Sequence, residues 1–254
     1  MTKSPWILPL LFLTGLCAGF VDSIAGGGGL ITLPVLLNVG IPADLALGTN
    51  KLQAAFGSGS ATWHFAKAGL IDSKEYKIGI FFTAIGAGLG TFCVQQIDPG
   101  ILKRLIPFLL LGIALWSLLQ PQLGAENVRS RMNLKSFHLV FGLVLGFYDG
   151  FLGPGTGAFW AMAYMIGAGF SLLRATAHTK VMNFTSNVVS LALFASANHV
   201  LYSAGLVMGT GQLLGARLGA HLVIKNGSRF IRPVFIMAAL ALTSKLLYEN
   251  FLKR

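Results

Sequence analysis

The chain has 254 residues, of which 54% are apolar and only 11% are charged, and its formal net charge is +11 at pH 7. A soluble domain carries about 25% charged residues, so this composition excludes an ordinary soluble protein and indicates a helical membrane protein. The cations gather between the apolar segments, as they do in cytoplasmic loops beside anionic lipid, which argues against nucleic-acid binding. Cys17 and Cys93 lie within apolar segments and give neither a disulfide framework nor a metal-ligand spacing.

The apolar segments follow an order that the second half of the chain repeats. Runs without Asp, Glu, Lys or Arg reach the roughly 20 residues with which a helix crosses the hydrocarbon core of a bilayer. The first half predicts an interrupted segment over 6–38 and helices near 46–66, 77–96 and 104–120. After a connector over 121–135, the second half predicts an interrupted segment over 136–169 and helices near 175–197, 203–223 and 231–248. We expect one integral membrane domain over 1–254, with repeats over about 6–120 and 136–248.

A repeated motif connects the two halves. Residues 15–28 read GLCAGFVDSIAGGG and residues 142–155 read GLVLGFYDGFLGPG, with seven of fourteen positions identical at a shift of 127. Both copies place glycine inside an apolar segment, and helices interrupted at matching positions of two halves are typical of transporter binding sites. The predicted fold class is therefore an all-α membrane protein, a polytopic helical bundle of two homologous halves. Duplication that serves only helix packing is the alternative.

The interrupted segments allow two topologies. Each could cross the bilayer once as a kinked span, or enter and return as a re-entrant hairpin. The hairpin gives the larger difference in Lys and Arg between the two sides of the membrane, and the richer side would be cytoplasmic. Each half would then cross three times, and an odd number of crossings inverts the second half relative to the first. Inverted repeats with a broken or re-entrant first segment are the prediction.

The glycine clusters at the two interruptions are candidate anion sites. The first copy contains Gly26, Gly27, Gly28 and Gly29, and the second contains Gly153, Pro154, Gly155, Thr156 and Gly157. Successive backbone N–H groups without side chains can converge on one point, and the half-helix that follows adds the positive end of its dipole. A small anion between the halves would meet both clusters. In the alternative, these glycines only allow the hairpin arms to pack closely.

Two acidic residues, Asp22 and Asp149, occupy matching positions inside apolar segments. An ionised carboxylate there costs about 3 kcal/mol or more, so it must be paired, protonated or engaged as a helix cap. Lys51 and Lys180, one in each half, are the expected partners, and each pair would clasp a hairpin to the following helix. The four residues are also candidates for a substrate or proton site, and the two roles are compatible.

Polar side chains surround both lysines and predict a polar face turned toward the bundle interior. The further candidates for substrate contact are Asn50, Gln53, Thr179 and Asn183, and Ser58 and Asn187 follow their lysines by two helical turns. His178 could serve a proton step or make a local hydrogen bond. Hydrogen bonding between helices is the alternative for each amide and hydroxyl. The sequence has no metal-ligand cluster, nucleophile motif or nucleotide-binding motif, so we expect neither an enzyme nor a cofactor.

Four stretches of the sequence resemble the TauE/SafE family of membrane permeases, and its YfcA-like members most closely. They read GFVDSIAGGGGLITLP, ALGTNKLQ, GFYDGFLGPGTG and ATAHTKVMNFTSN, and the similarity extends over nearly the whole chain. The resemblance implies a duplicated architecture and the movement of small anions, chiefly sulfite, sulfoacetate and other organosulfur compounds, across the bacterial inner membrane. Asp22 and Asp149 leave a cationic, zwitterionic or proton-coupled substrate open.

The combined prediction is a secondary transporter of small anionic solutes in the bacterial inner membrane, with its site between the two repeats. A gradient of protons would suit Asp22 and Asp149. The expected partners are a small solute and the lipid bilayer. A non-transporting membrane scaffold is the alternative, and in a scaffold the four charged residues would lie dry or scattered rather than around a shared cavity.

Overall fold

The computed structural model describes residues 6–102, 104–106, 108, 112, 130–227 and 230, and none of these residues lies in a strand. Helices of the first half are α1 (Ile7–Ala25), α2 (Gly28–Asn38), α3 (Ala43–Lys67) and α4 (Ser73–Gln95). Those of the second half are α6 (Leu134–Phe151), α7 (Thr156–Ala168), α8 (Leu172–Ser196) and α9 (Tyr202–Asn226). The expected helices over 104–120 and 231–248 and the connector over 121–135 lie mostly or wholly outside the described residues.

Glycine ends the first helix of each half where the sequence predicts an interruption. Gly26 follows α1 with φ 77°, and its N–H donates to the carbonyl of Asp22. In the second half, Gly153 and Gly155 have φ 94° and 79°. A residue with a Cβ is strained in this left-handed region, so glycine allows the chain to leave one helix and start the next within a few residues.

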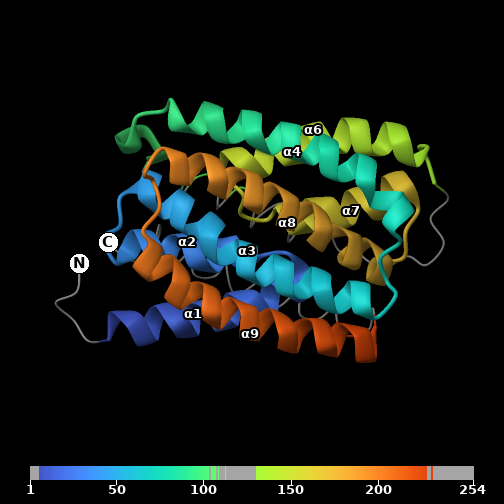
Figure 1. The fold of residues 1–254 in the computed structure, drawn as a ribbon, viewed down its shortest axis with the longest axis horizontal. Helices are drawn as coiled ribbons and strands as arrows, with labels where there is room; N and C mark the ends of the chain where they lie inside the picture. The colour runs from blue at the N-terminus through green and yellow to red at the C-terminus, as the bar shows by residue number, and fades with distance from the viewer. Residues whose placement is uncertain are drawn as a thin grey trace.

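The chain turns back at each interruption and forms a hairpin. α1 packs against α2, and α6 packs against α7. The N–H groups of Arg131 and Met132, just before α6, donate to the carbonyl of Gly167 near the end of α7, so the second hairpin returns to the end of the bundle from which it started. α1 and α2 follow the same course at the opposite end (Figure 1).

The long helices lie side by side along one axis of the bundle (Figure 1). The colour gradient shows that α1, α3 and α9 run in one direction and that α4, α6 and α8 run in the other. Helices in corresponding places of the two halves, such as α3 and α8, therefore run in opposite directions.

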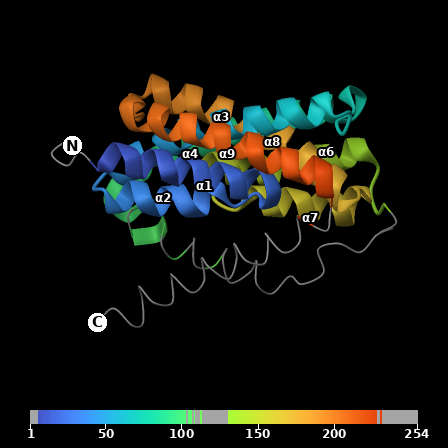
Figure 2. The ribbon, with the colours of Figure 1, turned by 90° about the horizontal axis from the view of Figure 1, so that it is seen from below.

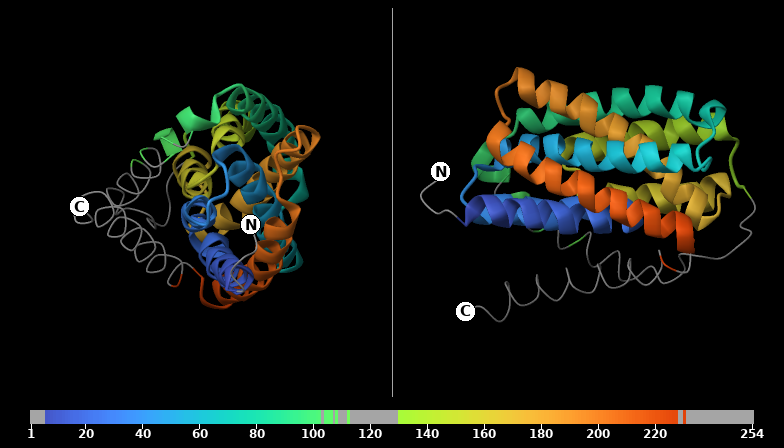
Figure 3. Two further views of the ribbon diagram at one scale, coloured as in Figure 1. Left: turned by 90° about the vertical axis from the view of Figure 1, so that its left-hand side faces the viewer. Right: turned by 60° about the horizontal axis from the view of Figure 1, so that its bottom comes forward.

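The two halves interlock through helix pairs that are packed at glycine. α1 lies along α9, and α4 lies along α6, so each pair joins one half to the other (Figure 3). A Cβ on Gly19 would lie 2.2 Å from the carbonyl oxygen of Gln212, and one on Gly90 would lie 2.0 Å from that of Phe147. Small residues at such contacts let the two backbones approach closely. Within a bilayer the hydrophobic effect does not drive helices together, so this close packing contributes to their association.

Two apolar clusters fill the opposite ends of the bundle. One is rich in aromatic side chains, including the buried Phe137, Trp160 and Tyr164. The other is mainly aliphatic and includes Leu33 and Leu36. Buried polar residues lie between the clusters, on the middle turns of α3 and α8 and around both interruptions. The fold therefore places a polar layer in the middle of the bundle, with apolar packing on either side.

Two of the described helices are long and apolar enough to cross a bilayer by length and composition alone, namely Ile7–Ala25 and Tyr76–Gln95. α3 and α8 each contain 25 residues. A helix of that length spans about 37 Å, which exceeds the thickness of a hydrocarbon core. Their buried polar residues lower their hydropathy, because these two helices line the interior of the bundle.

Candidate functional site

The two interruptions meet near the middle of the bundle (Figure 2). The loop after α1 contacts the start of α7 so closely that a Cβ on Gly26 would lie 2.4 Å from the carbonyl carbon of Gly157. A Cβ on Gly157 would in turn lie 2.4 Å from the Cα of Gly26. Both positions require glycine, because any side chain would push the hairpins of the two halves apart.

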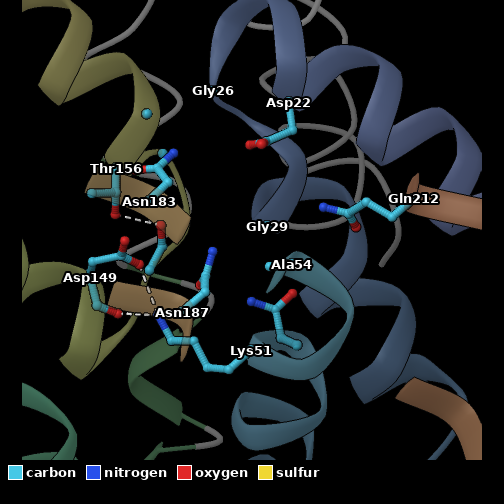
Figure 4. Close-up of a pocket in the computed structure, with 14 residues that line it drawn as sticks. Asp22, Gly26, Gly29, Lys51, Ala54, Asp149, Thr156, Asn183, Asn187 and Gln212 are labelled. Atoms are coloured by element: carbon cyan, nitrogen blue, oxygen red, sulfur yellow. Dashed lines mark hydrogen bonds and ion pairs between the residues drawn. The ribbon is translucent and has the colours of Figure 1, made fainter. Parts of the chain in front are cut away.

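A pocket opens beside this contact (Figure 4). Its lining comprises Asp22, Gly26, Gly29, Asn50, Lys51, Ala54, Asp149, Gly153, Gly155, Thr156, Gly157, Asn183, Asn187 and Gln212. The volume that the centre of a water molecule can occupy is about 30 Å³. One water needs about 10–15 Å³ by this measure, so the pocket has room for a solute of only a few heavy atoms.

Lys51 forms a buried ion pair with Asp149. Its Nζ lies 2.8 Å from Asp149 Oδ1 and also donates to the backbone carbonyl of Asp149. The second carboxylate oxygen, Oδ2, accepts a hydrogen bond from Ser186 Oγ. The side chains of Lys51 and Asp149 are 1% and 5% exposed. Both charges are therefore compensated in a place where an unpaired charge would be very costly.

The second pair, Lys180 with Asp22, is looser. Lys180 Nζ donates to the backbone carbonyl of Asp22, and it lies 3.4 Å from Asp22 Oδ2. Asp22 Oδ1 accepts from the N–H of Gly28, 3.2 Å away, so the carboxylate also caps the start of α2. The Asp22 side chain is 14% exposed, and its carboxylate points into the pocket (Figure 4).

Both ion pairs cross from one half to the other, whereas the sequence predicted clasps between each hairpin and its own following helix. α3 carries Lys51 to the hairpin of the second half, and α8 carries Lys180 to the hairpin of the first. The reason is the packing of α3 against α8 in the centre, which turns each lysine toward the opposite interruption. The charged residues thus join the halves instead of stabilising each half alone.

A hydrogen-bond network orients Asn50 at the pocket wall. Asn50 Oδ1 accepts from Thr32 Oγ1 at 2.6 Å and from Gln53 Nε2 at 2.8 Å. With its oxygen engaged on the far side, the amide presents its NH₂ group to the pocket that it lines. Gln53 lies behind Asn50 and is fully buried.

The starts of α2 and α7 supply further donors. Gly29 at the start of α2, and Thr156 and Gly157 at the start of α7, line the pocket. The first N–H groups of a helix have no partner within the helix, and they carry the positive end of its dipole. Thr156 Oγ1 donates to the carbonyl of Gly153 at 2.6 Å, which fixes its hydroxyl against the loop.

The structure brings most, but not all, of the residues singled out in the sequence into the pocket. Those outside its lining are Gly27, Gly28, Gln53, Ser58, Pro154, His178, Thr179 and Lys180. Lys180 still touches the site through Asp22. His178 packs against the rings of Phe170 and Tyr164, with centroid distances of 5.0 and 5.7 Å.

Two lining residues, Ala54 and Gln212, were not among the candidates from the sequence. Ala54 takes the place that Asn183 holds in the repeat, at a shift of 129. Gln212 lies on the glycine-rich α9, and its carboxamide reaches the pocket from the side opposite Asn183 (Figure 4). Among the described residues, no group of three or more His, Cys, Asp or Glu is arranged to hold a metal ion.

Comparison with known proteins identifies relatives along the whole chain. The family model described as sulfite exporter TauE/SafE matches residues 11–246. A probable membrane transporter protein of Haemophilus influenzae is 44% identical over 96% of each chain. The probable membrane transporter protein YfcA of Escherichia coli K12 is 43% identical over 97% of this chain and 92% of its own. A further relative, the probable membrane transporter protein ORF9 of Sinorhizobium sp, is 44% identical over 96% of this chain and 93% of its own.

No solved structure gives a significant match. The family match covers far more than half of the chain, and it includes both glycine interruptions, both ion pairs and every residue that lines the pocket. The chain therefore belongs to the TauE/SafE family of membrane proteins, and the relatives named above are probable membrane transporters.

Proposed function

We propose that this protein is a secondary transporter of small anions, with its binding site in the pocket between two inverted repeats. The observation that carries the proposal is the convergence of both interruptions and both buried ion pairs on one small pocket. A purely structural clasp does not require a cavity. A pocket among buried charges lowers the packing density and adds no stabilising contact.

The chemistry of the lining suits an anion held mainly by neutral donors. Lys51 and Lys180 are committed to the two aspartates, so the four charged groups leave the site close to neutral. The helix starts at Gly29 and Gly157 and the NH₂ group of Asn50 then supply hydrogen bonds to an oxyanion. These donors lie on both halves, as expected of a site on the axis between two repeats.

Proton coupling follows from the same charge balance. An anion that enters this small, nearly neutral site adds one negative charge beside Asp22 and Asp149. Like charges at short range disfavour each other, so the bound anion favours protonation of a neighbouring carboxylate. Uptake of a solute anion together with a proton restores the original charge of the site.

The arrangement of the helices supports inverted repeats and alternating access. Corresponding helices of the two halves run in opposite directions, and each hairpin returns to the end from which it came (Figure 1). The two apolar clusters lie on either side of the polar layer and would serve as the two barriers. Loosening of one cluster at a time would expose the pocket to one side of the membrane and then to the other.

Charge at the two ends of the bundle supports a defined orientation in the inner membrane. One end of the bundle carries the exposed Lys67, Lys77, Arg131, Lys135, Arg174 and Lys225 (Figure 1). Described charged residues at the other end are Asp44, Asp98 and Arg104. Lys and Arg are enriched on the cytoplasmic side, so the first end would face the cytoplasm of a bacterial cell in a multi-pass topology.

Counterflow into proteoliposomes tests the proposal. Vesicles that contain the purified protein and are loaded with unlabelled sulfite should accumulate external radiolabelled sulfite, and methanesulfonate should compete. The name of the family makes sulfite the first solute to test. Protein-free vesicles are the control. If neither solute exchanges and neither raises the melting temperature of the protein, the result would instead favour a membrane scaffold.

A further inference from the structure

We infer that Gln212 is a specificity-determining residue of this pocket, which favours anions with three or four oxygens on one centre over carboxylates. The inference rests on the proposed transport function, and it assigns the selectivity between classes of anion to one side chain. Gln212 belongs to α9, is 1% exposed as a residue, and lines the pocket. Its amide nitrogen points toward the middle of the pocket, opposite Asn183 (Figure 4).

Glycines on two neighbouring helices make room for this side chain. A Cβ on Gly57 of α3 would lie 2.4 Å from Cγ and 2.7 Å from Nε2 of Gln212. A Cβ on Gly19 of α1 would lie 2.2 Å from the backbone oxygen of Gln212. The approach of α9 to both helices, and therefore the reach of the amide into the pocket, depends on these two missing side chains.

The carbonyl oxygen of the Gln212 side chain, Oε1, is buried and has no hydrogen-bond partner among the described residues. Buried amides are nearly always satisfied, because the loss of water must be compensated by a partner in the protein or by a ligand. Asn50, on the other side of the same pocket, has two partners for its oxygen. No hydrogen bond between Gln212 and the described residues turns its carboxamide away from the pocket. Nε2, which faces the pocket, is therefore available to donate to an anion that enters it.

The counterpart of Gln212 in the first half does not reach the pocket. At the shift of 129, Gln212 corresponds to Thr83. The two backbones hold equivalent places, because a Cβ on Gly146 would lie 2.7 Å from the oxygen of Thr83, much as Gly19 faces Gln212. Thr83 Oγ1, however, donates to Met182 Sδ at 3.4 Å, away from the pocket lining. Gln212 thus adds a donor on one flank of the pocket, and its counterpart in the first half adds none.

A donor on one flank distinguishes anions by shape. The starts of α2 and α7 approach from the two halves, and they can serve the two coplanar oxygens of a carboxylate. A sulfite or sulfonate group has a third oxygen outside that plane. Gln212 Nε2, which faces the pocket from α9, would donate to this oxygen. One neutral hydrogen bond to a charged acceptor corresponds to roughly a tenfold or greater difference in affinity.

The test uses two competitors that differ only in the anionic group. Methanesulfonate and acetate each carry one methyl group and one negative charge at pH 7, and each is titrated against counterflow of labelled sulfite. We expect the wild-type protein to prefer methanesulfonate. Gln212→Met should raise the inhibition constant of methanesulfonate about tenfold and that of acetate less than about twofold. Gln212→Glu keeps the shape, adds a negative charge, and should weaken both competitors.

Thr83→Val is the matched control, because it changes the equivalent place outside the pocket and should leave the preference unchanged. The melting temperature of Gln212→Met should equal or exceed that of the wild type, since the amide has no partner to lose. Intact exchange with an unchanged preference in Gln212→Met would overturn the inference alone. Equal weakening of both competitors together with a lower melting temperature would assign a structural role and overturn it as well. If the wild-type protein exchanges none of these anions, the proposed function fails and the inference falls with it.

Discussion

Lys51 on α3 lies 2.8 Å from Asp149 on α6, so the most buried ion pair of the site joins the two halves of the chain. Lys180 and Asp22 repeat this connection in the opposite sense at 3.4 Å. Each long central helix is thereby fixed to the interruption of the other half. Any movement of one half against the other must either carry these pairs along or break them.

A double-mutant cycle checks that the pairing crosses between halves. Asp149→Asn should lower the free energy of unfolding by about 3 kcal/mol, because it leaves Lys51 buried without its counter-ion. Lys51→Met combined with Asp149→Asn should lose less than the sum of the single changes, with a coupling energy of about 2 kcal/mol. Unfolding in detergent micelles, followed by circular dichroism, gives these energies. The same cycle for Lys51 and Asp22 serves as control, and a larger coupling there would contradict the crossed arrangement.

The contact between the two interruptions predicts a sharp difference between neighbouring glycines. Gly157→Ala places a methyl group 2.4 Å from the Cα of Gly26, so the hairpins must separate. We expect a loss of about 2 kcal/mol in stability and a large loss of exchange. Gly27→Ala is the control in the same region, because its nearest neighbour would be 3.8 Å away. Equal behaviour of the two variants in melting and counterflow would show that the close contact is not needed.

Much of this arrangement could be predicted from the sequence, because interruption and charge are local signals. A glycine cluster inside an apolar run marks the end of a helix, and the same cluster appears twice at half-chain spacing, around Gly26 and Gly153. A lone carboxylate such as Asp22 in an apolar segment requires a partner. These two facts predicted the broken helices and the ion pairs.

The partners within each pair could not be predicted in the same way. The sequence offers one lysine in each half, but the packing of α3 against α8 decides which hairpin each lysine meets. The sequence does not identify Gln212 as a pocket residue for a related reason. Its counterpart in the repeat is a threonine, and its side chain can extend into the pocket only because Gly57 on α3 leaves room for it. Contacts between segments that are far apart in the chain produce no periodic pattern in the sequence.

Thr32 should matter for the solute although it does not line the pocket. Its hydroxyl donates to Asn50 Oδ1 at 2.6 Å and so holds the NH₂ group of that amide toward the pocket. Thr32→Val keeps the shape but removes the donor. We expect a loss of about 1 kcal/mol in stability and a severalfold rise in the solute concentration for half-maximal counterflow.

Thr14→Val is a suitable control for this substitution, because Thr14 is also a buried threonine of the first hairpin but lies on α1, away from the pocket lining. Exchange by this variant should resemble that of the wild type. Unchanged exchange in Thr32→Val would mean that Gln53 alone is sufficient to orient Asn50.

Asp22 is the carboxylate that we expect to take the proton. It is the more exposed of the two, its lysine is more distant, and Asp149 is held by both Lys51 and Ser186. Because a bound anion favours protonation of a carboxylate beside it, binding of methanesulfonate to the wild-type protein should take up protons from a weakly buffered solution. Asp22→Asn should abolish exchange while the protein stays folded, and its binding should take up no proton. The upward shift of the melting temperature by methanesulfonate reports binding in each case, and a pH-indicator dye reports proton uptake. Asp149→Asn should retain the proton uptake, and binding to the wild type without proton uptake would remove Asp22 from proton coupling.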